Sequence, residues 1–281
     1  MEQTISSDLD YTTYDLSIQI SLNGFSFCIQ NEFSGIEKIE QVYFENQQTP
    51  ERLLEKLNII YKEHPFLIKN FATVTVVYQN ELFSLVPKSL FDENQPELYL
   101  NYSVRTLPTD FIAFDNLEKE EAVMVYVPYV NINNFFFETY GSFSYYHSQS
   151  ILLKTLRSQS IFTSDTHLIC NLLPDSFELI LLIAGKIVVV NSFYYQNEED
   201  FLYYHLFTAE QYELDPEQFQ LHLIGLTANL EKEPIYQLTK KYIRKINLIK
   251  PTIKNEELLK DTELKGLFTL LNTNHHAHYF R

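Results

Sequence analysis

Residues 16–27 read Leu-Ser-Ile-Gln-Ile-Ser-Leu-Asn-Gly-Phe-Ser-Phe, and this stretch decides the fold. Apolar and polar residues alternate on both sides of Asn23-Gly24, which is the period of a strand with one buried face. Asn-Gly between two such runs predicts a type I′ hairpin, because both residues tolerate a positive φ. We expect two antiparallel strands here and a third strand over residues 36–44, after a second turn.

A helix is predicted after these strands. Thr49 can cap its first turn and Pro50 suits its first position, where a missing N–H costs nothing. The apolar residues that follow recur at helical spacing; they are Leu53, Leu54, Leu57, Ile60 and Tyr61. Residues 72–78, Ala-Thr-Val-Thr-Val-Val-Tyr, are rich in β-branched side chains and predict another strand.

The second half of the chain repeats this order. It contains three predicted strands, a helix that begins near Glu198, a strand and a helix that begins near Pro234; the strands are residues 167–173, 177–184, 187–195 and 220–225. Pairing Phe25 with Phe177 gives an offset of 152 residues, and the same offset nearly aligns the other elements. An internal duplication explains this agreement.

The length of 281 residues suits two domains of about 100–150 residues. We predict a first domain over residues 1–160 and a second over 161–281, with a subdomain inserted in the first at about 88–158. Within the insert we expect a hairpin around Asp115-Asn116, a strand at 122–129 and a helix at 131–140. The fold class is α/β with mixed sheets.

The chain is acidic, with a formal net charge of −16 and a pI near 4.9. Such a charge repels nucleic acid and anionic lipid. The basic residues between Lys240 and Lys250 are expected on a solvated helix face. The first residues lack a secretory signal pattern, and the longest apolar run, residues 179–184, is too short to span a bilayer. We therefore expect a cytoplasmic protein without nucleic-acid or membrane binding.

Three stretches resemble a known family: residues 16–27, residues 83–87 (Phe-Ser-Leu-Val-Pro) and residues 191–204 (Asn-Ser-Phe-Tyr-Tyr-Gln-Asn-Glu-Glu-Asp-Phe-Leu-Tyr-Tyr). Together they resemble an uncharacterised bacterial family of unknown function with an actin-like ATPase fold. The resemblance covers most of the chain and implies two RNase H-like domains that face a cleft. It implies a more distant similarity to pilus-assembly and cell-division proteins of that fold, and carries no assigned chemistry.

Actin-like ATPases place an Asp-x-Gly-type turn between the first two strands of each domain, where backbone N–H groups hold phosphate and the Asp holds a hydrated metal. Laying that pattern on this chain puts Ser21 and Leu173 at the two Asp positions. A register slip of two residues would let Asp175 serve, with Asn23 opposite it. The favoured interpretation is instead that Asp175 is a turn residue whose side chain bonds local backbone. Gly225 lies where the adenosine-side glycines of that fold follow a strand, although a simple turn explains it equally.

Other reactive side chains give weaker signals. Cys28 and Cys170 lie in apolar strands and are interpreted as small buried hydrophobic residues rather than nucleophiles. His275, His276 and His278 form a cluster that could bind a metal, but a frayed terminus explains them better.

Two further clusters, of acidic and of aromatic residues, have ordinary explanations. Glu118, Glu120 and Glu121 could be paired carboxylates, but solvated surface is the usual explanation for such a run. Phe135, Phe136 and Phe137, together with Tyr145-Tyr146, could stack against bases or line a partner groove, whereas core packing is the ordinary explanation. Three consecutive helical Phe residues cannot all point inward, so at least one should be exposed.

The sequence supports no assignment of a catalytic, cofactor-binding or metal-binding residue, and no cofactor. The favoured hypothesis is a non-catalytic actin-like scaffold that binds an unknown protein partner or itself. The alternative is an atypical nucleotide-binding ATPase or switch that uses the interdomain cleft.

Overall fold

The computed structural model describes residues 10–101, 104–107, 109–225, 232–251 and 265–277. Within them lie two five-stranded mixed sheets and one three-stranded sheet. The first sheet has the order β3 (Gly35–Tyr43), β2 (Gly24–Asn31), β1 (Asp15–Ser21), β4 (Thr73–Tyr78), β8 (Ser144–His147). The second has the order β11 (Lys186–Tyr194), β10 (Ser176–Ile183), β9 (Thr166–Leu172), β12 (Gln220–Ile224), β13 (Lys245–Ile249). The third, here called the insert sheet, has the order β5 (Phe83–Pro87), β7 (Ala122–Tyr126), β6 (Ala113–Leu117).

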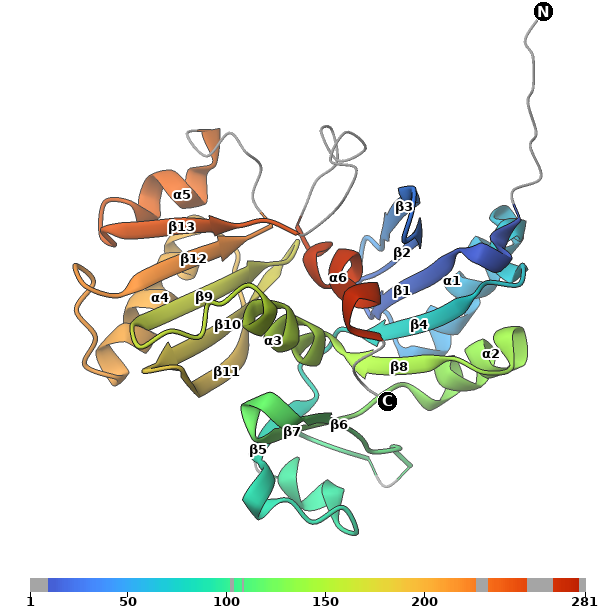
Figure 1. Cartoon of the computed structure of the whole chain (residues 1–281), viewed down its shortest axis with the longest axis horizontal. Helices are drawn as coiled ribbons and strands as arrows, with labels where there is room; N and C mark the ends of the chain where they lie inside the picture. The colour runs from blue at the N-terminus through green and yellow to red at the C-terminus, as the bar shows by residue number, and fades with distance from the viewer. Residues whose placement is uncertain (1–9, 102–103, 108, 226–231, 252–264, 278–281) are drawn as a thin grey trace, which may run out of the picture.

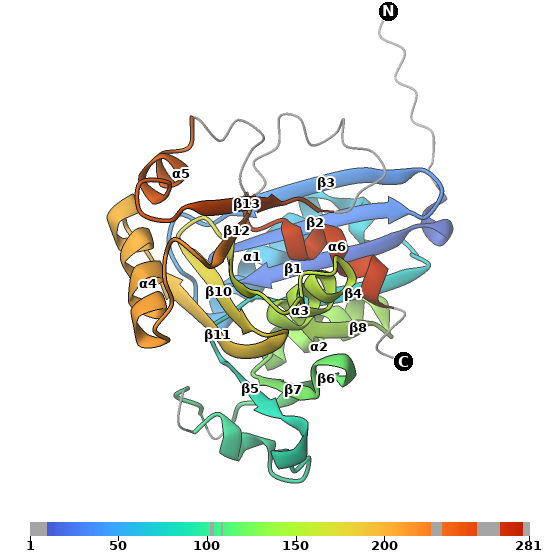
Figure 2. The ribbon, with the colours of Figure 1, turned by 60° about the vertical axis from the view of Figure 1, so that its left-hand side comes forward.

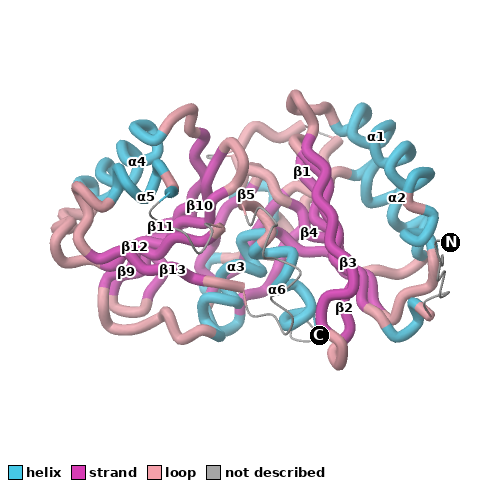
Figure 3. The backbone as a smooth tube through the Cα atoms, turned by 90° about the horizontal axis from the view of Figure 1, so that it is seen from above, coloured by secondary structure: helices cyan, strands magenta, loops and turns pink. Residues whose placement is uncertain are grey.

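Six α-helices lie in the described residues and form layers around the sheets; they are α1 (Pro50–Glu63), α2 (Val130–Tyr140), α3 (Ser148–Ser158), α4 (Glu198–Gln211), α5 (Pro234–Thr239) and α6 (Phe268–Ala277). Figure 1 shows the second sheet on the left, the first sheet on the right and the insert sheet below both. Figure 3 shows α1 and α2 outside the first sheet, α4 outside the second, and α3 and α6 between the sheets. The molecule is therefore a two-domain α/β protein, as predicted.

The two large sheets repeat one another in topology and in detail. In each, the first strand pairs antiparallel with the second and parallel with the fourth. The ladder between the second and third strands is interrupted between Ile29 and Gln30 in the first sheet and between Leu181 and Leu182 in the second. These positions are 152 residues apart, so the two bulges are equivalent and support the predicted duplication.

The predicted helix after the third strand is confirmed as α1. The Thr49 side chain accepts a hydrogen bond from the Arg52 N–H at 3.4 Å, and Pro50 is the first helical residue. Four apolar residues of α1 are buried against the sheet: Leu53, Leu57, Ile60 and Tyr61. The equivalent helix α4 begins after Asn197, whose side chain accepts from the Asp200 N–H at 2.8 Å.

The inner faces of both sheets are covered, which differs from the half-exposed strands that alternation predicts. Ser17 and Gln19 point away from the apolar side of β1 yet are buried, because α6 packs against β1 and β4. Ile180 and Leu182 of β10 belong to the same apolar cluster as Leu152 of α3. The helices α3 and α6 also contact each other, so they join the two domains.

Three local predictions are wrong. The turn between β1 and β2 consists of Leu22 and Asn23, because Gly24 already pairs with Ser21, and neither Asn23 nor Gly24 has the positive φ of a type I′ turn. Asp115 and Asn116 do not form a turn: both lie in β6, and the chain reverses over Glu118–Glu120, a 3₁₀ turn that ends at Glu121 with φ +50°. The basic residues of 240–250 are not on one helix face, because α5 ends at Thr239 and Lys245 begins β13.

Gly225 provides a test of the fold, because it follows β12 with φ +89° and a Cβ there would lie 3.0 Å from the Leu172 carbonyl oxygen. We expect Gly225→Ala to lower the free energy of unfolding by about 2–4 kcal/mol, through strain and the clash with backbone. Gly141 has φ +74° but open space around it, since a Cβ there would meet no atom within 4 Å, so Gly141→Ala should cost only about 1 kcal/mol. Urea unfolding of the two variants checks this, and equal costs would contradict the crowding at Gly225.

Candidate functional site

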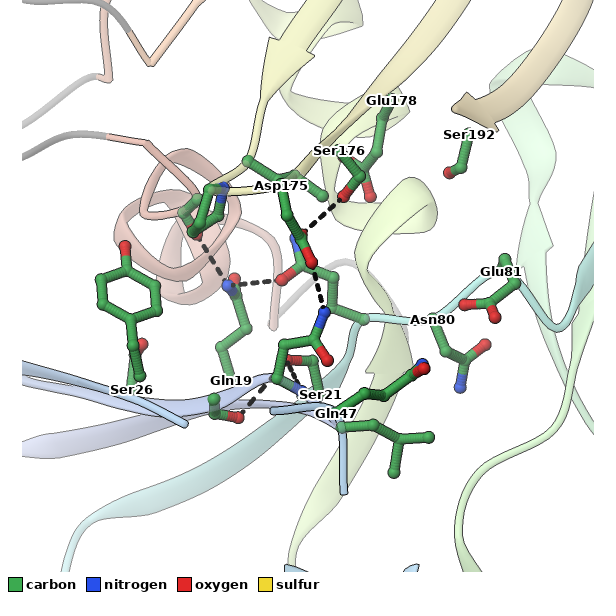
Figure 4. A pocket seen from close by; sticks show the side chains of 18 of the residues that line it. Gln19, Ser21, Ser26, Gln47, Asn80, Glu81, Asp175, Ser176, Glu178 and Ser192 are labelled. Atoms are coloured by element: carbon green, nitrogen blue, oxygen red, sulfur yellow. Dashed lines mark hydrogen bonds between the residues drawn. The ribbon is translucent and has the colours of Figure 1, made fainter. Parts of the chain in front are cut away.

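The candidate site lies where the β1–β2 turn of the first domain faces the β9–β10 turn of the second. A cavity of about 80 Å³ opens between them. Polar side chains contribute much of its wall, and Figure 4 shows side chains from both domains pointing into it. The volume has room for only a handful of water molecules, at roughly 10–15 Å³ each. Ligand pockets are commonly about 300–1,000 Å³, so the site is small for a nucleotide.

An exposed hydrogen bond joins the two turns across this site. Asn23 Nδ2 donates to Asp175 Oδ2 at 2.7 Å (Figure 4). The two residues are 152 positions apart, so each occupies the same corner of its domain. The sequence favours Asp175 as a turn residue that bonds its local backbone, whereas the side chain contacts Asn23, the residue that the less favoured register places opposite it. Because the acceptor is a carboxylate, the bond is stronger than one between neutral groups.

Ser21 and Leu173 occupy the other predicted position of the two turns. Ser21 Oγ accepts from the Asn23 N–H at 3.2 Å and lies 3.4 Å from the Gly24 carbonyl oxygen, so it serves its own turn. Leu173 is buried, and its N–H donates to the Ser176 carbonyl at 2.9 Å. Neither side chain carries a charge into the cavity.

The N-terminal end of α6 forms another part of the wall. Gln19 Nε2 donates to the Gly266 carbonyl at 2.7 Å, and Thr269 Oγ1 donates to Gln19 Oε1 at 2.6 Å. Beside it, the Gly266 N–H donates to the Leu172 carbonyl. The space next to Gly225 is therefore filled by the chain itself, through Leu172 and Lys265.

Glu178 is a buried carboxylate at the back of the cavity. It accepts from Ser148 Oγ of α3 at 2.8 Å and from Asn171 Nδ2 at 2.7 Å. Burial raises the pKa of Glu178, and the two donors only partly oppose that effect. Both donors are neutral, so the group is held by hydrogen bonds and ties α3 to the second sheet.

Tyr194 of the second domain lies beside Glu81 of the first, and both side chains line the cavity. Burial and the negative charges of Glu81 and Asp175 raise the pKa of Tyr194 to about 12. Asn23 Oδ1 and Gln79 Nε2 are buried without a hydrogen-bond partner among the described residues, and both side chains line the cavity. Within the same residues, no three His, Cys, Asp or Glu side chains are grouped as a metal site requires.

A buried polar cluster next to the site was not predicted. Asp115 accepts from the His147 N–H at 2.9 Å and from Tyr126 OH at 3.2 Å, and burial raises its pKa to about 6. Burial lowers the pKa of His147 to about 3, so the ring is neutral; it lies 3.1 Å from the Asn80 carbonyl oxygen. The neighbouring Ser148 bonds Glu178, so the start of α3 connects the insert sheet and both domains. The only sequence signal was the polar run His147–Ser150.

The other predicted side chains take structural places. Cys28 and Cys170 are buried and form no disulfide, and burial raises the pKa of Cys28 to about 12. Phe136 is fully buried, whereas Phe137 is 64% exposed, which confirms that one of the Phe residues reaches the surface. His275 and His276 lie in the last turn of α6, and His278 lies outside the described residues.

The acidic run follows the prediction of solvated surface at Glu118 and Glu121, which are exposed, but not at Glu120. Glu118 pairs with Lys88 at the surface. Glu120, in contrast, is not solvated, because its side chain is buried and bonds Arg157 Nε of α3 at 3.1 Å. The ion pair anchors the insert to α3 and is not a pair of carboxylates.

Similarity to solved structures defines the fold of this protein. A protein from Bacteroides thetaiotaomicron with an actin-like ATPase fold and unknown function has a TM-score of 0.75 and 23% identity, over 86% of this chain and 93% of that one. The PilM-PilN type IV pilus biogenesis complex contains a chain with a TM-score of 0.57 and 10% identity, over 92% of this chain and 95% of that one. The chain therefore has the actin-like ATPase fold, as the resemblance implied.

The family follows from the sequence. The model of the family described as "Protein of unknown function (DUF3822)" matches residues 4–246, and the chain belongs to this family. A search of curated proteins found no match. No helix in the described part of the chain has both the length and the apolar character needed to cross a membrane.

The contact between the turns can be measured by a double-mutant cycle. We expect Asn23→Ala and Asp175→Ala to show a coupling of about 0.5–1.5 kcal/mol in the free energy of unfolding, because each removes the same hydrogen bond. Asp92 bonds only within its own loop in the insert, so Asn23→Ala and Asp92→Ala should be additive. Additivity of Asn23 with Asp175 would show that the turns are not held together in solution.

The buried carboxylate Asp115 predicts a pH effect. Its pKa is raised from 3.8 to about 6 on folding, so the folded chain holds its proton more tightly, and stability falls as the pH rises from about 4 to 6. The change is roughly 3 kcal/mol at most. His147 and Lys154 face the Asp115 carboxyl group. Burial lowers the pKa of His147, so the contribution of this residue makes stability rise, rather than fall, as the pH increases over the same range.

Comparison with Asp115→Asn isolates the effect, because the histidines are common to both proteins. The stability of the native protein relative to this variant should decline between about pH 4 and 6.5 in urea unfolding. A difference that is constant with pH would contradict a raised pKa at Asp115.

Proposed function

We propose that this protein is a non-catalytic member of the actin-like fold that acts as a scaffold for a protein partner or for itself. The observation that carries the proposal is the hydrogen bond from Asn23 to Asp175. In actin-like ATPases the corresponding turns hold phosphate and metal between them. Here the turns are joined to each other by a hydrogen bond, which supports a site that does not hold phosphate between them.

The composition of the turns supports the same proposal. Ser21 and Leu173 stand at the two positions where the ATPase pattern has Asp. Pro174 lacks a backbone donor, and phosphate loops depend on such donors. The cavity of about 80 Å³ would have to widen several-fold to admit a nucleotide.

The partner class is supported by charge and by the surface. A net charge of −16 disfavours nucleic acid and anionic membranes as direct partners. Exposed aromatic residues lie on the outer helices, among them Phe137 of α2 and the stacked pair Tyr203 and Phe207 of α4. Such residues are typical of protein contact surfaces. The similar chain of the PilM-PilN type IV pilus biogenesis complex is itself part of a protein complex.

The alternative function is an atypical nucleotide-dependent ATPase or switch. Asp175 lines the cavity together with Glu81, and Asp175 could hold a hydrated metal if the turns separated. This alternative requires the bond to Asn23 to break when nucleotide enters.

Thermal unfolding with and without about 5 mM Mg-ATP separates the two functions. A scaffold should show no saturable rise in Tm, whereas a site with Kd near one-hundredth of the ligand concentration would be stabilised by about 2.7 kcal/mol, or several degrees. A saturable rise that Asp175→Ala abolishes and Asp92→Ala retains would overturn the proposal and establish the alternative.

A further inference from the structure

The outer side of α4 carries aromatic residues that nothing in the described structure covers. Figure 2 shows α4 at the outer margin of the second domain. Tyr203 is 59% exposed and Phe207 is 42% exposed, and their rings stack with centroids 5.7 Å apart. Tyr203 also contacts Tyr204, whose ring stacks on Phe193 of β11 at 4.5 Å. The four rings form a continuous aromatic path from the edge strand onto the helix.

The corresponding helix of the first domain shows that the fold does not require this path. Both α1 and α4 have 14 residues and follow a capping side chain, Thr49 or Asn197. Aligned on these caps, the helices share four buried positions, which are Leu53, Leu57, Ile60 and Tyr61 in α1 and Phe201, His205, Thr208 and Ala209 in α4.

The outward positions of the two helices differ in character. Glu55 of α1 is exposed and corresponds to Tyr203 of α4. Lys56 is likewise exposed and corresponds to Tyr204. A helix at the surface needs apolar residues only on the side that faces its sheet. The aromatic outward positions of α4 therefore indicate a contact beyond the domain itself.

Acidic residues lie at both ends of the exposed aromatic pair. Glu199 precedes Tyr203 by one turn, Glu210 follows Phe207 by three positions, and both glutamates are exposed on the same side of the helix. We call the surface from Glu199 to Glu210, with Tyr203 and Phe207 between them, the α4 face. Neither carboxylate has an ion-pair partner among the described residues.

The chain around the α4 face supplies little positive charge. Residues 187–231 contain no Lys or Arg. The helix α5 contacts α4, and its Lys240 lies over the ring of Tyr236 at 5.3 Å. Beyond it, Arg244 pairs with Glu217 at 2.9 Å. The described residues thus bring no cation to either end of the α4 face.

The position of Glu210 is unfavourable for the helix itself. The last turn of a helix carries a partial negative charge, so it favours Lys or Arg and disfavours a carboxylate. The corresponding residue of α1 is Lys62, whereas the last turn of α4 has no basic residue. A cation held beside Glu210 would offset this repulsion.

The spacing of the α4 face fits a helical occupant. Glu199, Tyr203 and Phe207 recur every four residues and form a ridge along α4, and such a ridge packs into the groove between two ridges of another helix. The helix rises roughly 16 Å from Glu199 to Glu210, at about 1.5 Å per residue. A partner helix of about three turns matches that length.

The charge of the α4 face decides between the occupants. If two copies of this chain paired their α4 helices, parallel or antiparallel, carboxylates would lie against carboxylates at both ends. An anionic membrane meets the same repulsion. A segment with Lys or Arg at both ends of an apolar stripe makes contacts between opposite charges instead.

We propose that the α4 face binds an amphipathic helix of a protein partner, with an apolar stripe over Tyr203 and Phe207 and a basic residue near each of Glu199 and Glu210. Recognition of this kind reads apolar anchors at helical spacing, and the flanking charges set orientation and specificity. The inference rests on the proposed scaffold function and names the class of partner.

The test selects peptides that bind the full chain from a display library. Each peptide is about sixteen residues long, enough to form a helix, and is randomised along one side. Enriched peptides should carry large apolar residues at helical spacing between Lys or Arg residues. Either the absence of enrichment above background or enrichment without Lys and Arg would overturn the proposal.

An alanine variant locates the bound peptide. An enriched peptide should bind Phe207→Ala at least about tenfold more weakly, because buried aromatic anchors carry much of the binding energy in such interfaces. The matched control is Ile59→Ala, since Ile59 is 52% exposed at the corresponding position of α1 and should not affect binding. Fluorescence anisotropy of the labelled peptide measures both. Equal affinity for Phe207→Ala and the native chain would place the peptide elsewhere and refute the proposal.

A charge-reversal variant tests the basic residues of the partner. Glu210→Lys should weaken the peptide about threefold to tenfold, because an exposed attraction becomes a repulsion. Glu63→Lys reverses an exposed charge in the last turn of α1 and should leave the affinity unchanged. If both variants weakened the peptide equally, the general acidity of the chain rather than the α4 face would account for binding, against the proposal.

Sedimentation equilibrium of the chain without peptide examines a second copy as the occupant. We expect Phe207→Ala to leave self-association unchanged. A dimer that this substitution dissociates would assign the α4 face to a second copy and overturn the proposal. The Mg-ATP experiment reports on the interdomain cleft and these experiments report on α4, so failure of the docking face and failure of the scaffold function are distinguishable.

Discussion

The inner face of each large sheet carries polar side chains that must find partners away from water, and this constraint organises the molecule. Gln19 of β1 and Glu178 of β10 are both buried. Gln19 is satisfied by the start of α6 and Glu178 by the start of α3. A buried polar group left without a partner costs about 1–3 kcal/mol, so each helix has one favoured packing position on its sheet. The packing positions of α3 and α6 in turn fix how the two domains face each other.

The narrow cleft follows from the way in which α3 and α6 pack on the sheets. Once α6 lies on β1 and α3 lies on β10, the two β-turns meet, and Asn23 and Asp175 come within hydrogen-bond distance. The insert is attached to the same helix, through Asp115 at the His147 N–H and through Arg157 at Glu120. The two domains and the insert sheet therefore share the start of α3 as a common point of contact.

Local patterns predicted the repeated unit well because its signals are local. The cap at Thr49, the alternation of β1 and the presence of a tight turn near Asn23 are all read within a few residues, although the turn is not the type I′ turn that Asn23-Gly24 predicts. The elements that sequence reasoning missed are held by distant contacts: β8 spans only Ser144–His147, and α3 begins with a polar run whose burial depends on Glu178 and Asp115. The misplaced turn at Asp115 has the same cause, since an Asp-Asn pair is typical of turns and its burial depends on donors from β7 and the start of α3.

The bond between Asn23 and Asp175 has a consequence for the history of the repeat. The two residues occupy the same corner of duplicated domains, so in a symmetric pair of identical units this position would face its own copy. Two aspartates would repel one another there, whereas one amide and one carboxylate attract. Identical subunits cannot supply that unlike pair. The two halves of this chain differ at this corner, and the contact between an amide and a carboxylate across the cleft depends on that difference.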